Sequence, residues 1–345
     1  MRTAAVGAAL LLVLGACGGH SPGPPPLPPG LPAQVDGIPY QRGMVYGIFG
    51  RHGMEFHRAN LVALHDLGVD SVQIVVPHSM ETIQATTISG DDPDLTPSRE
   101  SLEQAVALAH SLGLRVFIFP IVFVRHLEED EWRGVLAPSD WDAWWDAYET
   151  FILDEARWAA AHQVEIFSVG SELLSTESME GRWRDLVAQV RRIFPGLVTY
   201  SANWDHLDVI GFADTLDFLG MNAYFEVGDA APTLEGLLQA WSHSLSVVAR
   251  WQARHGKPVV VTEIGYPSRR GGTVDPWNYL GDGEPDVNEQ DLGYRAFILA
   301  WRSRPWYAGA YFYMWWDDAQ GGRGYTPRGK PAAETLRRWY TLGQP

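Results

Sequence analysis

Short apolar runs alternate with amphipathic stretches from about residue 44 to the end of the chain. Eight of these runs are predicted strands, and several are continuously apolar, as expected of parallel strands covered on both faces. They span residues 45–49, 71–76, 115–120, 166–169, 198–201, 218–221, 258–262 and 310–314. The pattern therefore predicts an α/β protein with a largely parallel sheet.

The stretches between the predicted strands have helical spacing. Thr96 followed by Pro97 predicts the start of one helix, because Pro is favoured at the first helical position. Trp144 and Tyr148 belong to a second helix, and a third, from residue 234, ends near Gly256. Strand and helix thus alternate eight times without a change in composition, which predicts a single (β/α)8 barrel over residues 37–345.

A doubly wound open sheet is the competing architecture. Such sheets usually carry a glycine-rich phosphate turn after the first strand. Gly47, Gly50 and Gly53 do not fit the spacing G-x-G-x-x-G. The barrel is therefore the preferred interpretation.

The first 36 residues do not belong to the barrel. Arg2 and an apolar run over residues 4–14 are typical of a secretory signal peptide. Cys17 directly follows Leu-Gly-Ala, which resembles the lipobox of bacterial lipoproteins, where the cysteine is acylated. We expect a signal peptide over residues 1–16 and a lipidated, Pro/Gly-rich linker over residues 17–36, although an ordinary signal peptide with an incidental cysteine stays open.

This beginning predicts an exported protein that is attached to the cell envelope only through its lipid. Gly18 follows the cysteine, where inner-membrane lipoproteins carry an aspartate, so the outer membrane or cell surface is favoured. A net charge of −16 argues against a nucleic-acid partner.

Metal and cofactor signals are weak. One cysteine excludes an internal disulfide framework and a cysteine-rich metal centre, and the histidines show no ligand spacing. A long turn-rich stretch, residues 269–288, contains Asp282, Glu284 and Asp286, which could bind calcium but do not fit the EF-hand spacing. We expect no metal, no cofactor and a monomer.

Two glutamates stand at the ends of predicted strands. Glu172 follows the fourth predicted strand and Glu263 follows the seventh. In a (β/α)8 barrel, both would lie at the C-terminal mouth, where catalytic groups of this fold are found. Hydrolysis of a glycosidic bond needs one carboxyl that is protonated and a second that is ionised.

Several motifs extend this observation along the chain. The placement of the two glutamates resembles clan A of the retaining glycoside hydrolases, and within it the chain most resembles glycoside hydrolase family 113, the endo-β-1,4-mannanases. The resemblance covers residues 42–340. The matching segments are Trp-Arg-Gly at 132–134, Ser-Val-Gly-Ser-Glu-Leu at 168–173, Tyr-Ser-Ala-Asn-Trp-Asp at 200–205, Leu-Gly-Met-Asn-Ala-Tyr-Phe at 219–225, Thr-Glu-Ile-Gly-Tyr at 262–266 and Tyr-Thr-Pro-Arg-Gly-Lys-Pro at 325–331.

The resemblance implies roles for single residues. Glu172 would be the general acid/base, Glu263 the nucleophile, and the Tyr224 hydroxyl would hold the nucleophile. The residues that would line the sugar-binding cleft are Asn203, Trp204 and Asn222. Many clan A enzymes have asparagine before the acid/base, whereas this chain has Ser171, which is shorter but can also bind a sugar hydroxyl.

Aromatic side chains are further candidates for sugar binding. Most of the fifteen tryptophans lie on predicted helices, where burial in the core is the better interpretation. The candidates for sugar platforms stand at strand ends or in the long loop: Trp204, Tyr266, Trp277, Trp315 and Trp316, with Asp317 beside them.

The sequence thus predicts a retaining glycoside hydrolase that acts on a β-linked polysaccharide, with β-1,4-mannan favoured. A non-catalytic carbohydrate-binding lipoprotein on a degenerate barrel is one alternative. A related clan A enzyme acting on another β-glycan is the other, because the fold does not select the sugar.

Overall fold

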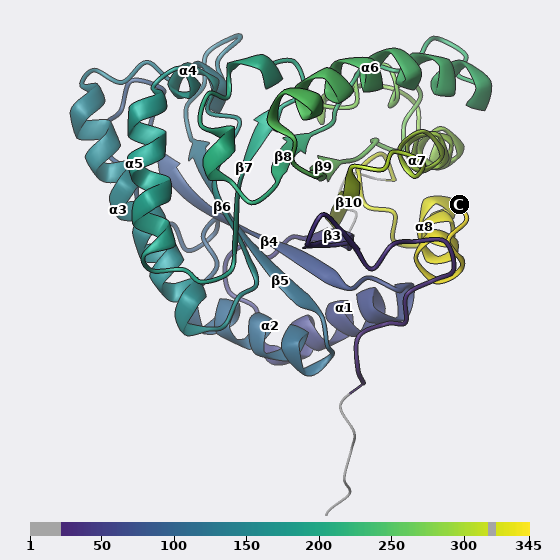
Figure 1. Ribbon diagram of the computed structural model, residues 1–345, viewed down its shortest axis with the longest axis horizontal. Helices are drawn as coiled ribbons and strands as arrows, with labels where there is room; N and C mark the ends of the chain where they lie inside the picture. Colours follow the sequence, from purple (N-terminus) through teal and green to yellow (C-terminus); the bar gives the residue numbers. More distant parts are fainter. Residues whose placement is uncertain (1–21, 317–321) are drawn as a thin grey trace, which may run out of the picture.

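The chain forms a closed barrel of eight parallel strands (Figure 1). The computed structural model describes residues 22–316 and 322–345, so Cys17, the signal peptide and Asp317 lie outside the described residues. The barrel strands are β3 (Gln41–Tyr46), β4 (Ser71–Met80), β5 (Arg115–Val124), β6 (Ile166–Ser171), β7 (Leu197–Asn203), β8 (Leu219–Asn222), β9 (Val259–Ile264) and β10 (Tyr307–Trp315). Because β10 pairs with both β9 and β3, the sheet has no free edge. The predicted fold class is confirmed, and each predicted strand overlaps an observed one.

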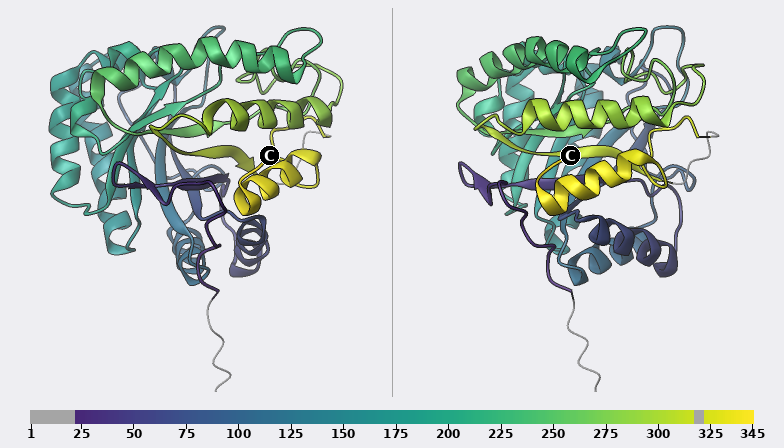
Figure 2. Two further views of the ribbon diagram at one scale, coloured as in Figure 1. Left: turned by 45° about the vertical axis from the view of Figure 1, so that its right-hand side comes forward. Right: turned by 90° about the vertical axis from the view of Figure 1, so that its right-hand side faces the viewer.

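Helices surround the barrel, as the three views show (Figures 1 and 2). They are α1 (Met54–Leu67), α2 (Arg99–Ser111), α3 (Trp141–Ala161), α4 (Leu174–Glu177), α5 (Glu180–Arg191), α6 (Leu234–His255), α7 (Val287–Trp301) and α8 (Pro331–Leu342). The connection from β7 to β8 contains two short 3₁₀ turns, Leu207–Val209 and Ala213–Thr215, in place of an α-helix. The regular alternation is therefore interrupted once.

The ends of the helices can be compared with the cap residues that the sequence predicted. Gly256 ends α6 with a φ of 65°, a left-handed conformation that glycine adopts at little cost, so this prediction is confirmed. The predicted start at Thr96 is wrong by two residues. Ser98 caps α2 by accepting a hydrogen bond from the Ser101 amide, whereas the Thr96 hydroxyl donates to the Pro77 carbonyl. A tertiary contact thus takes the hydroxyl that the local pattern assigns to the cap.

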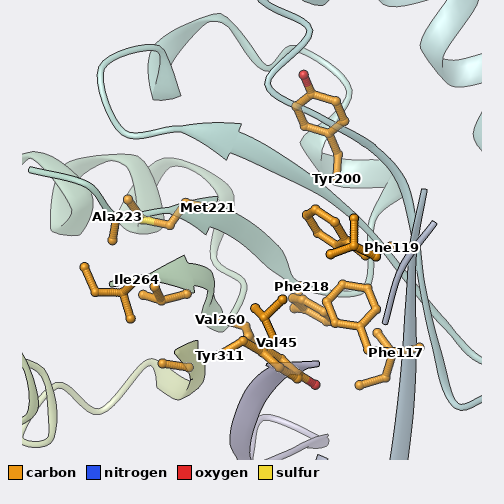
Figure 3. Packing of buried hydrophobic residues seen from close by; sticks show 14 of the residues in the cluster. Val45, Phe117, Phe119, Tyr200, Phe218, Met221, Ala223, Val260, Ile264 and Tyr311 are labelled. Carbon is orange, nitrogen blue, oxygen red and sulfur yellow. The ribbon is translucent and has the colours of Figure 1, made fainter. Parts of the chain in front are cut away.

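Large side chains fill the barrel and the layer between barrel and helices (Figure 3). Inside the barrel, the Phe117 ring meets Phe119 and Tyr311 edge to face, with centroids 5.4 and 5.3 Å apart. Six tryptophans are almost completely buried: Trp144, Trp145, Trp183, Trp241, Trp251 and Trp301. Burial of an aromatic side chain stabilises the fold by about 2–3 kcal/mol relative to exposure. The expectation that tryptophans on helices are core residues is confirmed for Trp144, Trp145, Trp241 and Trp251, whereas Trp141 and Trp158 are partly buried.

The N-terminal face is closed by a small hairpin, β1 (Gln34–Val35) and β2 (Ile38–Pro39). Below it, the buried Arg42 guanidinium donates to the carbonyls of Pro25 and Pro26 and pairs with Asp70. These bonds attach the described part of the proline-rich segment to the barrel. None of the helices in the described ranges, 22–316 and 322–345, is long and apolar enough to cross a membrane.

Candidate active site

Glu172 directly follows β6 and is 7% exposed. Its φ of 55° lies in the left-handed region, which costs a non-glycine residue about 1–3 kcal/mol and is frequent at active sites. Its amide donates to the Ser201 carbonyl at 3.0 Å, a bond that ties this turn to β7. The side chain is therefore held at the mouth of the barrel by an unusual but fixed backbone.

A buried hydrogen-bonded network supports the next residue. The Leu173 amide donates to the Tyr200 hydroxyl at 2.9 Å, and that hydroxyl donates to Glu177 at 2.6 Å. The second Glu177 oxygen pairs with His206. Burial raises the pKa of Glu177, the charge of Glu172 adds to the rise, and the bonds from Tyr200 and His206 oppose it. The network holds the turn that presents Glu172 and is a feature that the sequence alone did not predict.

Asn222, the last residue of β8, connects the two halves of the site. Its Oδ1 accepts from the hydroxyls of Ser201 at 2.7 Å and Thr262 at 3.0 Å. These donors fix the orientation of the amide, so Nδ2 points to Glu172 and donates to Oε1 at 2.8 Å. Asn222 is also the register partner of Glu263 in the neighbouring strand. One residue therefore contacts the first carboxyl and lies beside the second.

Glu263 is the last but one residue of β9 and is 8% exposed. The Tyr224 hydroxyl donates to its Oε2 at 3.2 Å. Burial and the nearby charge of Glu172 raise the pKa of Glu263 to about 7, while Arg133 and Tyr224 lower it. The two carboxyls are thus close enough for the charge of one to oppose ionisation of the other.

Arg133 is the cation of this site. It lies in the 3₁₀ turn Arg133–Val135 after β5, and its guanidinium pairs with Glu172 Oε2. Burial lowers the pKa of Arg133, but the negative charges of Glu172 and Glu263 outweigh this effect and raise it overall. Arg133 therefore acts on both carboxyls. The Trp-Arg-Gly motif contained the signal for this residue, but no strand-end position marked it.

The two carboxyls differ in their hydrogen-bond donors. Arg133 and Asn222 both donate to Glu172, while Glu263 has one neutral donor, the Tyr224 hydroxyl. Burial and the nearby charge of Glu172 raise the pKa of Glu263 to about 7, which favours its protonated form near neutral pH.

Three predicted cleft residues lie at or directly after the ends of β6 and β7. The Ser171 hydroxyl lies 3.4 Å from Asn222 Nδ2 and is buried. Asn203 pairs with Asn222 across β7 and β8, and its amide donates to Asp205. Trp204 is half-buried and its ring lies 5.2 Å from that of Phe225.

The aromatic candidates divide into two groups. Tyr266 is completely buried against Gly293 and Tyr294, so the prediction that it is a sugar platform is wrong. Trp315 is 5% exposed, and its indole packs under the Arg328 guanidinium at 5.8 Å. Their positions after strands predicted that both residues lie near the mouth of the barrel, but not the direction of their rings.

Two other candidates are accessible. Trp316 is half-buried in an aromatic cluster, and its ring centroid lies 5.4 Å from that of Phe49. Trp277 is 52% exposed, and its indole N–H donates to Glu226 at 3.3 Å.

No group of His, Cys, Asp or Glu that could hold a metal ion is present among residues 22–316 and 322–345. In the acidic loop, Asp286 accepts from the amides of Asn288 and Glu289 and so caps α7. One of the three candidate calcium ligands therefore has a structural partner.

Glu172 and Glu263 are two buried carboxyls at the same mouth of the barrel, and cleavage of a glycosidic bond requires a pair of carboxyl groups. The strands that carry them are the fourth and seventh of the barrel, so fold and site together define a glycoside hydrolase. The sequence model of Glycoside Hydrolase Family 113 matches residues 44–327. The chain belongs to glycoside hydrolase family 113.

Solved structures agree with this assignment. A family 113 β-mannanase from Alicyclobacillus acidocaldarius, in complex with ManMIm, is 29% identical with a TM-score of 0.78, covering 88% of this chain and 98% of that one. A family 113 β-1,4-mannanase complex is 25% identical with a TM-score of 0.77, over 87% of this chain and 98% of the other. A glycoside hydrolase family 5 mannosidase from Rhizomucor miehei, 11% identical with a TM-score of 0.56, shares the fold; the match covers 88% of this chain and 94% of that one. No curated protein sequence matches the chain.

Proposed function

We propose that the enzyme hydrolyses β-1,4-mannan with retention of configuration, Glu172 serving as acid/base and Glu263 as nucleophile. The arrangement that carries this proposal is the buried pair of carboxyls, with Asn222 between them and Tyr224 on Glu263. The mannan assignment rests on the family and on the β-mannanases that the chain resembles.

In the first step, the Glu263 carboxylate attacks the anomeric carbon and Glu172 gives its proton to the departing glycosidic oxygen. This forms a glycosyl ester and breaks the glycosidic bond. In the second step, the Glu172 carboxylate takes a proton from water, whose oxygen attacks the anomeric carbon and releases Glu263. The sugar leaves with the configuration that it had in the polymer.

The first step needs the proton on Glu172, whereas the raised pKa of Glu263 favours a proton on that carboxyl in the free enzyme. Arg133 interacts with both carboxyls and can neutralise either of them. A glycosidic oxygen that binds at Glu172 Oε2 takes the place of the guanidinium there, which leaves Arg133 to pair with Glu263. Substrate binding thereby shifts the proton to the carboxyl that must donate it.

The test is hydrolysis of a panel of β-glycans, followed by the stereochemistry of rescue. We expect reducing ends from β-1,4-mannan, with the β-anomer formed first in an NMR time course. Glu263→Ala with azide and an activated aryl β-mannoside should give the α-mannosyl azide, and Glu172→Ala should give the β-mannosyl azide. Glu235→Ala, at an exposed position of α6, is the control and should behave as wild type.

Each outcome decides one part of the proposal. Reducing ends from another β-glycan only would replace mannan as the substrate. An α-azide from Glu172→Ala would exchange the two roles, and full activity of Glu263→Ala would remove this residue from the mechanism.

We also propose that the enzyme acts as a monomer at the cell envelope, held by lipid on Cys17. The lipobox-like Leu-Gly-Ala-Cys and the preceding apolar run support this proposal.

A further inference from the structure

The loop between β9 and α7 exposes an unusual set of apolar side chains. Trp277 is 52%, Tyr279 63% and Leu280 74% exposed. Within the described part of the chain, no other tryptophan or tyrosine is among the exposed large hydrophobic residues. Exposed apolar groups that are clustered mark binding surfaces more often than scattered ones do.

The loop that carries these residues is held in place by contacts among its own residues. The Arg269 guanidinium is 6% exposed and donates to Asp275 Oδ1 at 2.7 Å and to the Asn278 carbonyl at 3.1 Å. A Cβ on Gly281 would lie 2.2 Å from the same guanidinium, so the loop closes tightly around it. The buried arginine therefore fixes the segment on both sides of Tyr279.

Two further anchors tie the loop to the barrel. Glu289 of α7 accepts from the Gly271 amide at 3.0 Å and from the amide and hydroxyl of Thr273, both at 2.9 Å. The Tyr325 hydroxyl donates to the Pro276 carbonyl at 2.6 Å. The exposed side chains thus stand on a preorganised backbone, which lowers the conformational entropy lost when a ligand binds.

The same anchors place the loop at the end of the barrel that holds the two carboxyls. The Tyr325 ring meets Tyr313 of β10 edge to face, with ring centroids 5.3 Å apart. Trp277 donates to Glu226, which lies two residues after Tyr224, and the Tyr224 hydroxyl donates to Glu263. The surface formed by Trp277, Tyr279 and Leu280 therefore lies on the same side of the barrel as Glu263.

We infer that Trp277, Tyr279 and Leu280 form an outer subsite that stacks against the rings of a long β-linked polysaccharide. This inference rests on the proposed function. Aromatic faces pack on the C–H faces of pyranose rings, while the indole N–H and the phenol hydroxyl remain at the rim to bind sugar hydroxyls. The position of the loop on the side of the barrel that holds Glu263 favours the polymer being cleaved over a protein partner. The subsite makes the enzyme prefer long chains to short oligosaccharides.

The test compares kcat/KM on mannan and mannohexaose with kcat/KM on the shortest manno-oligosaccharide that the wild type cleaves. Tyr279→Ala should lower the ratio of the long-chain to the short-chain kcat/KM about fivefold, because a lost aromatic contact is worth roughly 0.5–1.5 kcal/mol. The double variant Trp277→Ala/Tyr279→Ala should lower it further. Tyr279→Phe retains the ring and should keep most of the ratio, and Leu342→Ala, at an exposed position of α8, is the surface control.

The outcomes separate this inference from the proposed function. An unchanged ratio in the double variant, or an equal loss on short and long chains, overturns the subsite and leaves the mannanase in place. A wild type that cleaves no mannan of any length overturns the proposed function, and the subsite with it. Melting temperatures of all variants should match the wild type, because the substituted side chains are exposed.

Discussion

The shared proton of Glu172 and Glu263 gives a prediction for the pH profile. Moving the pKa of Glu263 from 4.5 to about 7 corresponds to a preference of about 3 kcal/mol for its protonated form. Below about pH 7 Glu263 retains a proton, which the pair can pass to the leaving group. Above about pH 7 Glu263 is ionised and this proton is lost. We expect kcat/KM on mannan to fall above about pH 7, roughly tenfold per pH unit.

Glu172→Gln tests the cause of this decline. The substitution removes the negative charge that opposes ionisation of Glu263, so the pKa of Glu263 falls below about 7. An aryl β-mannoside with a very acidic leaving phenol needs no proton donor for cleavage. On this substrate the variant should form the glycosyl ester without loss of rate between pH 7 and pH 9.

The measurement is the burst of released phenol in a stopped-flow instrument, with wild type on mannan measured over the same range. Glu235→Gln, on the exposed face of α6, controls for the loss of a carboxylate elsewhere. A burst rate that still falls above pH 7 in Glu172→Gln would show that the limb belongs to another group. A wild-type limb above pH 9 would contradict the raised pKa itself.

Three more predictions follow from the same contacts. A raised carboxyl pKa gives stability that is complete below about pH 4.5 and lost as pH rises through about 7, so urea denaturation should show a loss approaching 3 kcal/mol between pH 4.5 and pH 8, and a smaller loss in Glu172→Gln. Tyr200→Phe leaves the Leu173 amide and one oxygen of the buried Glu177 without the hydroxyl that they bond, which should cost about 1–3 kcal/mol of stability and lower kcat more than KM; an unchanged kcat would contradict a positioning role. Cys17→Ser should release the protein from the membrane fraction and abolish labelling by radioactive palmitate, whereas continued labelling would place the lipid elsewhere.

The sequence predicted the barrel because its signal is repeated. Eight apolar runs bounded by polar turns give eight strands, and an error at one boundary, such as the helix start at Thr96, leaves the others intact. Closure of the sheet follows from the number and order of the strands. The missing helix between β7 and β8 was not predictable in the same way, since a short 3₁₀ connection has no periodic signal of its own.

Individual site residues were predictable only where chain position determines where the side chain points. Glu172 directly follows β6 and Glu263 lies near the end of β9, so the strands bring both to the same mouth. Tyr266 comes three residues after Glu263 yet turns into the core, because the chain bends and Gly293 makes room for its ring. Arg133 lies 39 residues before Glu172 in a short turn, and only the folded chain brings them together.

The charges of Glu172, Glu263 and Arg133 at the barrel mouth affect both catalysis and the stability of the fold. Burial opposes charge on both carboxyls, so the free enzyme retains one proton up to about pH 7, on the carboxyl with the weaker donors. Arg133 pairs with Glu172 Oε2, an oxygen of the carboxyl that gives its proton to the leaving group in the proposed mechanism. In that mechanism, the glycosidic oxygen of a bound substrate displaces the guanidinium from Glu172. An Arg133→Met variant should bind substrate without this displacement, which predicts a lower KM. Because Arg133 lowers the pKa of Glu263, the same variant should also shift the basic limb above pH 7. A limb that stayed at pH 7 would show that Arg133 does not affect the pKa of Glu263.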